Sequence, residues 1–244
     1  MGRLKISIVI PAFNEERLLG ETLREVARAT GALAERGCEH ELIVCDNNST
    51  DRTAEIARAA GARVVFEPIN QIGRARNSGA AAASGDWLLF IDADSHPSAE
   101  LFRAMLTEIQ TGRCLAGGSV LKLDVGDFVA NFITAIWNLV SRYKRWVAGS
   151  FIFVETAAFR SLGGFSHEFF AGEELDLSRR LIQLAKERGR EIVILHRHPL
   201  RTSARKVKLY SGREHLRFML KAFLNHKRTI RDRTACYQWY DGRR

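Results

Sequence analysis

The pattern of apolar and polar positions changes its period repeatedly through the first ninety residues. Continuous apolar runs rich in β-branched residues predict buried strands at 6–11, 41–45, 62–66 and 87–91. Apolar residues at helical spacing between these runs predict helices at 18–27, 53–60 and 73–83. Asn14, which two glutamates follow, is the expected N-cap of the first helix. Strands and helices that alternate with short connections predict an α/β fold, with a mostly parallel sheet and helices on both faces.

The second half of the chain is less regular. Its apolar spacing predicts helices at 98–110, 128–143, 156–162 and 173–188, and strands at 116–123, 147–154 and 191–195. The helix at 128–143 carries an apolar stripe that contains Phe128, Phe132, Ile136, Val140 and Tyr143. Because no linker divides the chain, we expect one domain at 1–205, with halves at 1–95 and 96–205. A basic helical C-terminal extension is expected at 206–244.

Composition narrows the class of protein. The chain has 244 residues, of which 46% are hydrophobic and 27% charged, as is usual for a globular protein. Its four cysteines form no Cys-x-x-Cys pair, which argues against a zinc ribbon or a redox motif and suits a reducing compartment. The first residues lack the pattern of a signal peptide, and the uncharged run at 128–141 is too short for a membrane-spanning helix. We therefore expect a cytoplasmic protein.

The positive charge is concentrated at the C-terminal end. The net charge is +9, and residues 197–244 hold 14 Lys and Arg against 3 Asp and Glu. Residues 1–196 hold 23 against 25. A basic segment of this kind suits phosphate ligands, anionic lipid or nucleic acid, and it also occurs as a plain solvated tail.

Three polar clusters follow three of the predicted strands. They are Pro11-Ala12-Phe13-Asn14-Glu15, the run at 46–51, and Asp92-Ala93-Asp94. Ligands of open parallel sheets bind at the carboxyl ends of the strands, so these clusters mark one candidate site. Two carboxylates at positions i and i+2 are suited to a hard divalent cation that also binds substrate phosphates. Taken alone, such a pair also occurs in ordinary turns and helix caps.

The chain carries in order the blocks SIVIPAFNEE, ELIVCDNNSTDRTAEIA and GRARNSGAAAASGDWLLFIDAD. This series resembles the inverting family 2 glycosyltransferases of the GT-A fold. The later GGF at 163–165 and FFAGEELDLSRRL at 169–181 extend the resemblance to about residue 205. It implies a Rossmann-like nucleotide-sugar-binding half at 1–95 and an acceptor and catalytic half at 96–205. It also implies transfer from a nucleoside-diphosphate sugar (a UDP- or GDP-sugar) by direct displacement, with Mn²⁺ or Mg²⁺ as cofactor.

The resemblance assigns roles to matching positions. Asp94 would bind the metal that bridges the two phosphates, and Asp92 would lie by the ribose or sugar. Many relatives carry a second acid where this chain has Asn47. For Arg74 and Arg76, a solvated helix face is the alternative. The positions implied in nucleotide-sugar binding are Pro11, Phe13, Glu15, Asp46, Asn48, Arg74, Arg76, Asp92, Ala93, Asp94, Arg201 and Arg205.

The catalytic base is expected at the start of the helix at 173–188. Relatives commonly read Gly-Glu-Asp where this chain has Gly172-Glu173-Glu174, and in them the Asp is the general base. Glu174 is therefore the expected base for the acceptor hydroxyl, with Glu173 or Asp176 as alternatives. Acidic residues at a helix N-terminus are also favoured on electrostatic grounds alone.

The residues after the last predicted strand are candidates for closing over the diphosphate. They are His196, His198, Arg201, Arg205 and Lys206. His198 is the candidate for an additional metal ligand, whereas a surface or packing role is the interpretation of His196.

The acceptor is expected to lie against the irregular half. Candidate contacts there are Trp137, Trp146, Ser150, Phe151 and Phe170. The apolar stripe at 128–143 ends in basic residues, so it suits a peripheral position on an anionic membrane and a polyprenyl phosphate or another lipid-linked acceptor. Ordinary core packing of the stripe, with a soluble or glycan acceptor, is equally open.

Other classes of protein fit less well. Nucleotidyltransferases usually need a basic glycine-rich loop after the first strand, and dehydrogenases of the Rossmann type need Gly-x-Gly-x-x-Gly there. This chain has the acidic PAFNEE at that place. A non-enzymatic module that binds RNA or membrane through the basic tail stays open, although no nucleic-acid partner is expected.

Overall fold

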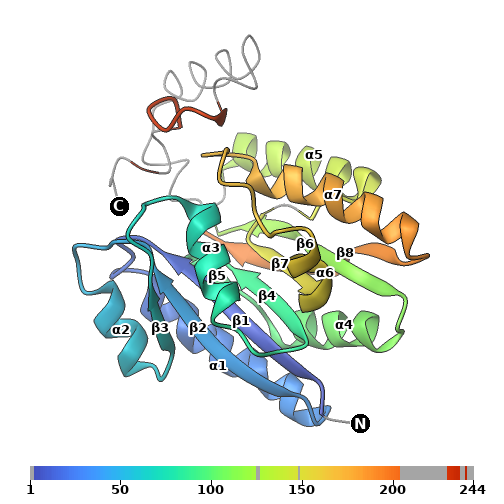
Figure 1. Ribbon diagram of the computed structural model, residues 1–244, viewed down its shortest axis with the longest axis horizontal. Helices are drawn as coiled ribbons and strands as arrows, with labels where there is room; N and C mark the ends of the chain where they lie inside the picture. The colour runs from blue at the N-terminus through green and yellow to red at the C-terminus, as the bar shows by residue number, and fades with distance from the viewer. Residues whose placement is uncertain (1–2, 125–126, 148, 204–229, 237–239, 241–244) are drawn as a thin grey trace.

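An eight-stranded sheet forms the centre of the molecule, and helices cover both of its faces (Figure 1). The computed structural model describes residues 3–124, 127–147, 149–203, 230–236 and 240. The strands of the described part are β1 (Lys5–Ala12), β2 (Glu39–Asp46), β3 (Arg63–Phe66), β4 (Trp87–Ile91), β5 (Ser95–His96), β6 (Cys114–Leu123), β7 (Phe151–Glu155) and β8 (Glu191–Thr202). Its helices are α1 (Leu19–Glu35), α2 (Thr53–Ala59), α3 (Ile72–Ala81), α4 (Ala99–Gln110), α5 (Phe128–Lys144), α6 (Thr156–Ser161) and α7 (Glu173–Glu187).

The sheet changes character between its two sides. Its strand order is β3-β2-β1-β4-β7-β6-β8-β5. The first four strands are parallel, whereas β7 runs antiparallel to both β4 and β6. β8 is parallel to β6, and β5 is antiparallel to β8. The predicted α/β architecture is confirmed, and the parallel strands come from the half where the strand and helix periods alternate most clearly.

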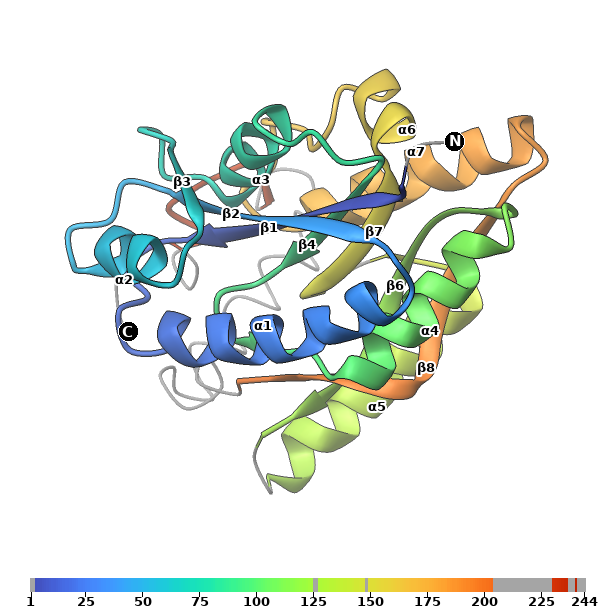
Figure 2. The same ribbon diagram turned by 90° about the horizontal axis from the view of Figure 1, so that it is seen from below.

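Two apolar cores lie on opposite faces of the sheet. Figure 2 shows α1 and α4 on one face, and α3, α6 and α7 on the other. The first core joins the α1 and α4 side chains to Ile6, Ile8 and Ile10 of β1. The second contains Val9 and Ile43, which point the other way because successive side chains of a strand alternate between faces.

The first helix begins later than the sequence predicts. α1 starts at Leu19, and Asn14 is not its N-cap. Asn14 instead adopts a left-handed conformation with φ of 51°, and its side-chain oxygen accepts a hydrogen bond from the Thr50 N–H at 2.8 Å. Its own N–H donates to the Ser49 hydroxyl at 3.0 Å. The competing hydrogen bonds to the loop after β2 explain the difference.

The last strand is longer than predicted. β8 continues to Thr202, because its second part pairs with the end of β6 through Leu121, Lys122 and Leu123. His196, His198 and Arg201 therefore lie within a strand and not in a loop after it, which corrects that part of the sequence analysis. Arg205 and Lys206 lie outside the described residues.

The basic helical extension predicted at 206–244 falls largely outside the described residues, so the division at residue 205 stays a prediction. The part of 206–244 that is described, 230–236 and 240, contacts the body of the protein. The Phe170 N–H donates to the Ile230 carbonyl at 2.7 Å, and Arg231 forms a 2.7 Å ion pair with Glu168. No helix of the described residues is long and apolar enough to cross a membrane.

Candidate active site

A pocket opens where β1, β2 and β4 end. Because these strands are parallel, the loops that follow them meet at one edge of the sheet. Six residues predicted for nucleotide-sugar binding line it, namely Pro11, Phe13, Glu15, Asp92, Ala93 and Asp94. Of the other lining residues, Ala12 and Asn47 belong to the predicted polar clusters, whereas the sequence analysis did not single out Asn70, Ile72 and Tyr240.

Asn47 connects two of the loops that form the pocket. Its side-chain nitrogen donates to the Ile69 carbonyl at 2.7 Å and to the Glu67 carbonyl at 3.2 Å. The loop between β3 and α3, which contributes Asn70 and Ile72, is thereby held against the end of β2. The amide thus has a structural role that a carboxylate could not take, because a carboxylate has no N–H to donate.

The neighbours of Asn47 also belong to the loop after β2. Asp46 is buried, and one of its carboxylate oxygens accepts from the Ser49 N–H at 3.0 Å. Asn48 adopts a left-handed conformation with φ of 66°. Neither residue lines the pocket, although both were expected at the nucleotide.

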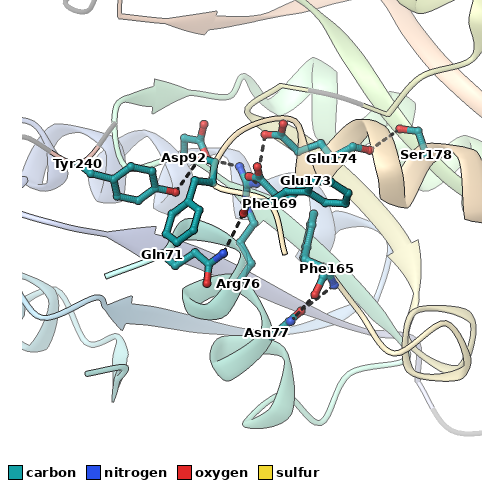
Figure 3. A network of polar contacts seen from close by, with 11 residues as sticks. Gln71, Arg76, Asn77, Asp92, Phe165, Phe169, Glu173, Glu174, Ser178 and Tyr240 are labelled. Atoms are coloured by element: carbon teal, nitrogen blue, oxygen red, sulfur yellow. Dashed lines mark hydrogen bonds and ion pairs between the residues drawn. The ribbon is translucent and has the colours of Figure 1, made fainter. Parts of the chain in front are cut away.

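Arg76 of α3 lies at the centre of a buried ionic cluster, shown in Figure 3. Its side chain is only 1% exposed. One terminal nitrogen donates to Asp92 at 2.9 Å, and the other donates to Glu173 at 2.8 Å and Glu174 at 3.1 Å. The guanidinium also lies over the ring of Phe165, 5.2 Å from the ring centroid. Arg76 is therefore not on a solvated helix face; it binds Asp92, which lines the pocket, and is not itself part of the lining.

The backbone around Arg76 is packed closely enough to fix its position. A Cβ on Gly79 would come within 2.4 Å of the Val9 side chain, so α3 approaches β1 at a distance that only glycine permits. Next to Arg76 in the sequence, the Asn77 side chain donates to the Phe165 carbonyl at 2.8 Å and accepts from the Phe165 N–H at 2.9 Å. The aromatic ring against Arg76 is thus held by a hydrogen-bonded pair, which Figure 3 also shows.

The electrostatics of the cluster are unbalanced, because three carboxylates share a single guanidinium. Burial and the neighbouring charge of Glu174 raise the pKa of Glu173, and Arg76 opposes this effect only in part. The three carboxylates in turn raise the pKa of Arg76, which stays charged. The cluster therefore favours a proton on Glu173 at a pH where an exposed glutamate has none.

Glu173 and Glu174 differ in their access to solvent. The Glu173 side chain is 3% exposed and the Glu174 side chain is 19% exposed. Neither lines the pocket itself, but Arg76 binds both and also binds Asp92, which does. Asp176, the third candidate base, forms a 2.7 Å ion pair with Arg180 and lines a separate hollow. Glu174 is thus the glutamate of the cluster that solvent reaches.

The remaining predicted residues lie apart from the pocket lining. Arg74 donates from its Nε to the Gln71 side chain at 3.0 Å. Arg201 pairs with His96 between β8 and β5. His198 lines a different cavity, with Glu100 and Arg103, on the α4 side of β8. His198 and Asp94 therefore line different pockets.

Tyr240 reaches the pocket from the far end of the sequence. Its hydroxyl donates to the Phe170 carbonyl at 2.9 Å, and its ring packs edge-on against the Phe170 ring. Cys236 is buried beside it, against Ala171. Nothing in the local sequence around Tyr240 signals this position, because its partners lie about seventy residues away.

The donor atoms of the pocket are of the kind that a hard divalent cation prefers. Asp92 and Asp94 offer carboxylate oxygens at the end of β4, and Asp94 is buried. Among the described residues no group of three or more His, Cys, Asp or Glu side chains converges as a complete cage. A cation that takes most of its ligands from phosphate and water, as Mg²⁺ and Mn²⁺ do with nucleotides, suits such a pair.

Residues 7–160 match the family model of glycosyl transferase family 2. This match covers more than half of the sequence and includes the strand ends that form the pocket. The chain belongs to glycosyl transferase family 2. Residues 163–181, which contain Glu173 and Glu174, lie beyond the matched segment.

Curated relatives are similar over part of their length. An uncharacterized glycosyltransferase of Mycobacterium tuberculosis is 34% identical over 113 residues, which are 46% of this chain and 47% of the relative. Dolichol-phosphate mannosyltransferase of Pyrococcus furiosus is 29% identical over 48% of this chain and 33% of its own length. Glycosyltransferase AglE of Haloferax volcanii is 28% identical over 78% of this chain and 64% of its own length. The chain thus spans less than two thirds of these relatives.

Solved glycosyltransferases share the fold. Staphylococcus aureus TarS in complex with UDP-GlcNAc superposes with a TM-score of 0.66 at 21% identity, over 98% of this chain and 79% of the other. Glucosyl-3-phosphoglycerate synthase of Mycobacterium tuberculosis, with Mn²⁺, UDP-glucose and phosphoglyceric acid, gives a TM-score of 0.60 at 23% identity, over 96% and 80%. These similarities identify the fold as GT-A.

Proposed function

We propose that this protein transfers a sugar from a nucleoside-diphosphate sugar to an acceptor hydroxyl or lipid phosphate, with a divalent metal and with inversion at the anomeric carbon. The observation that carries the proposal is the link from Asp92, which lines the pocket, through Arg76 to Glu174. It couples a candidate phosphate and sugar site to a candidate base through one fixed guanidinium. Family membership supports the proposed class of reaction.

The donor would lie in the pocket at the ends of β1, β2 and β4. Pro11, Phe13 and Glu15 border it on one side, and Asp92 and Asp94 on the other. A nucleotide in this position would lie against the carboxyl ends of parallel strands, as is general for such sheets. TarS and glucosyl-3-phosphoglycerate synthase, which share the fold, bind UDP-GlcNAc and UDP-glucose, which favours a UDP-sugar here.

Asp94, with Asp92 beside it, would hold the metal. A bound Mg²⁺ or Mn²⁺ supplies charge stabilisation for the departing diphosphate. Asp92 is at the same time held by Arg76, so its orientation is set before any ligand binds. This fixed placement is what a site requires in order to stabilise charge without reorganising.

Glu174 would act as the general base for a hydroxyl acceptor. Its carboxylate takes the proton as the acceptor oxygen attacks the anomeric carbon from the side opposite the diphosphate, and the bond to phosphate breaks. One displacement of this kind inverts the configuration. Glu173 is sealed from solvent and tends to hold a proton, so its role is to fix Arg76 and not to accept the proton of the acceptor.

For the acceptor we propose only a chemical class. The similarity to a dolichol-phosphate mannosyltransferase over 48% of this chain favours a lipid-linked acceptor such as a polyprenyl phosphate. A phosphate acceptor is already ionised near neutral pH and would depend less on Glu174. Transfer to a glycan hydroxyl would depend on Glu174 fully, so Glu174→Gln should affect the two classes of acceptor differently.

The experiment that tests the proposal is a thermal-shift series with UDP, GDP, CDP and dTDP, each with Mn²⁺ and again with EDTA. We expect one nucleotide to raise the melting temperature only when metal is present. Saturation at about one hundred times Kd stabilises a protein by about 2.7 kcal/mol, which is about 5–10 °C for a chain of this size.

The matched variants are Asp94→Asn and Asp176→Asn. Asp94→Asn should lose the metal-dependent shift, because it removes a carboxylate from the pocket. Asp176→Asn, whose carboxylate lines another hollow, should keep it. A full shift with Asp94→Asn would refute the metal assignment, and the absence of a shift with any nucleotide would refute the proposed donor site.

A further inference from the structure

The helix α5 is packed on the protein through its polar side. Ala130 and Ser141 are buried, and the Asn138 side chain lies against the end of β6. The Asn138 oxygen accepts from the Leu121 N–H at 2.9 Å, and its nitrogen donates to the Leu121 carbonyl at 2.9 Å. Two hydrogen bonds to one backbone unit fix the rotation of α5 about its axis.

The opposite side of α5 is apolar and exposed. Its large side chains recur at spacings of three and four residues, which places them on one helical face. Exposure ranges from 49% at Ile136 to 81% at Phe128 and Tyr143. The other members of this face are Val129, Phe132, Ile133 and Leu139. We call these seven side chains the α5 apolar face.

The α5 apolar face is unusual within the described part of the chain. Of the nine exposed large hydrophobic residues there, seven belong to it, and the other two are Phe66 and Ile69. A soluble surface rarely gathers so many apolar side chains on one element without a binding partner. In Figures 1 and 2, α5 lies at the periphery of the molecule, outside the sheet.

The charge next to the α5 apolar face identifies the class of partner. α5 itself contains no acidic residue, and Arg142, Lys144 and Arg145 follow the apolar side chains at its C-terminal end. All three are exposed. An apolar face bordered by cations is the pattern of a helix that lies in the interface of an anionic bilayer. The sequence from 197 to 244 adds further positive charge.

Both ends of α5 are connected to the pocket edge. After α5, the Ser150 carbonyl accepts from the Asp92 N–H at 3.3 Å. Before α5, Leu123 pairs with Thr202, and Thr202 pairs with Ser95, which follows Asp94. The segments on both sides of α5 are thus joined by backbone pairing to the strand end that carries the two aspartates.

We infer that the α5 apolar face binds the surface of an anionic membrane, with its apolar side chains in the acyl boundary and its three cations at lipid phosphates. The helix is 17 residues long and lies along the surface of the molecule, so it would rest in the interface and not span the bilayer. This inference does not depend on the proposed transfer reaction, since it concerns lipid binding without any nucleotide.

The test is co-sedimentation of the full chain with vesicles of phosphatidylcholine, with and without phosphatidylglycerol. We expect binding that requires the anionic lipid and weakens with salt. The triple variant Phe132→Ser, Ile136→Ser, Leu139→Ser should bind at least about tenfold more weakly, because it removes most of the inserted apolar surface. The control is Phe66→Ser, which removes an exposed aromatic side chain from β3 and should bind as the parent does.

A charge variant separates the two contributions. Arg142→Gln, Lys144→Gln and Arg145→Gln together should weaken the dependence on phosphatidylglycerol and on salt. Its matched control changes three exposed arginines of the α1 region to Gln and should have a smaller effect. These arginines are Arg24, Arg28 and Arg36.

Three results would overturn the inference. One is equal vesicle binding by the parent and the triple serine variant. Another is a parent that does not bind vesicles but forms a dimer that the serine variant lacks, which would make the partner a second copy. The third is a parent that does not bind vesicles while the serine variant melts several degrees lower, which would mean that another part of this chain covers the face.

Discussion

α4 and α5 are both amphipathic helices, and they present opposite sides to the protein. α4 begins at the Ser98 cap and buries Leu101, Phe102, Met105, Leu106 and Ile109. α5 begins at the Asp127 cap and buries only Ala130 and Ser141. The comparison teaches that apolar spacing predicts a helix but does not predict which way its apolar side faces. In α5 the direction is set by Asn138, a single polar residue on the other side.

The same contrast occurs within one turn of α7. Glu173 and Glu174 are adjacent in sequence and bind the same guanidinium, yet one is sealed and the other is reached by solvent. The two glutamates differ for the same reason that α4 and α5 differ: the side of the helix on which a residue lies determines whether it is buried.

The largest effect is expected at Glu174. Glu174→Gln should lower the release of nucleoside diphosphate from the donor, with water or a hydroxyl acceptor, by about 10²–10⁴-fold, the usual contribution of a general base. The nucleotide-dependent thermal shift should persist, because the pocket lining is unchanged. Asp176→Asn should retain activity. Near-normal turnover by Glu174→Gln would assign the base to another group.

Removing one aromatic ring from each helix tests the α4 and α5 comparison directly. Phe102→Ala should lower the free energy of unfolding by about 3–5 kcal/mol, because the ring is fully buried. Phe132→Ala should change it by no more than about 0.5 kcal/mol, since that ring is exposed. Denaturant unfolding of both variants measures the difference. A large loss with Phe132→Ala would show that the α5 apolar face is covered within the folded chain.

The pH dependence of stability separates the two glutamates further. Because the pKa of Glu173 is raised in the folded state, the folded protein binds more protons than the unfolded chain above the ordinary glutamate value of 4.5. The contribution of Glu173 to the free energy of unfolding therefore falls as the pH rises above 4.5, until Glu173 is ionised in the folded protein as well.

Glu173→Gln should remove this slope, so its stability relative to the parent should grow with pH by up to about 1.4 kcal/mol per unit. Urea unfolding at several pH values checks it, with Glu55→Gln, an exposed residue of α2, as the control. A stability difference between Glu173→Gln and the parent that stays constant with pH would mean that Glu173 is ionised in the folded protein.

The smallest effect is expected at Tyr240. Tyr240→Phe should lower the free energy of unfolding by about 0.5–1.5 kcal/mol, because the ring packing stays and only the hydrogen bond to the Phe170 carbonyl is lost. Tyr143→Phe on α5, where the side chain is 81% exposed, should change nothing measurable. Equal effects of the two variants would contradict the packing of Tyr240 against Phe170.

Much of the pocket could be predicted from the sequence because its residues follow the strands directly. A strand end is a local feature, and parallel pairing brings the ends of β1, β2 and β4 together without further information. Pro11 to Glu15 and Asp92 to Asp94 were found in this way.

The ionic cluster could not be predicted, because its contacts are not local. Arg76 is 16 residues from Asp92 but 97 and 98 residues from the two glutamates. The sequence of α3 is polar and rich in alanine, and nothing in it indicates that Arg76 is buried. The end of β8 could not be predicted for a related reason, since its last residues, 200–202, are placed by pairing with the end of β6 and not by their own alternation.

The binding of Arg76 both to Asp92, which is near in sequence, and to the distant helix α7 has a consequence for biosynthesis. A ribosome completes α3 and β4 long before it completes α7, and until then the guanidinium has one of its three partners. An arginine that would be buried with its charge largely unpaired resists burial, so the early half is not expected to fold to completion alone. The last contacts to form are then those of Glu173 and Glu174, so under the proposed mechanism an unfinished chain would lack its base.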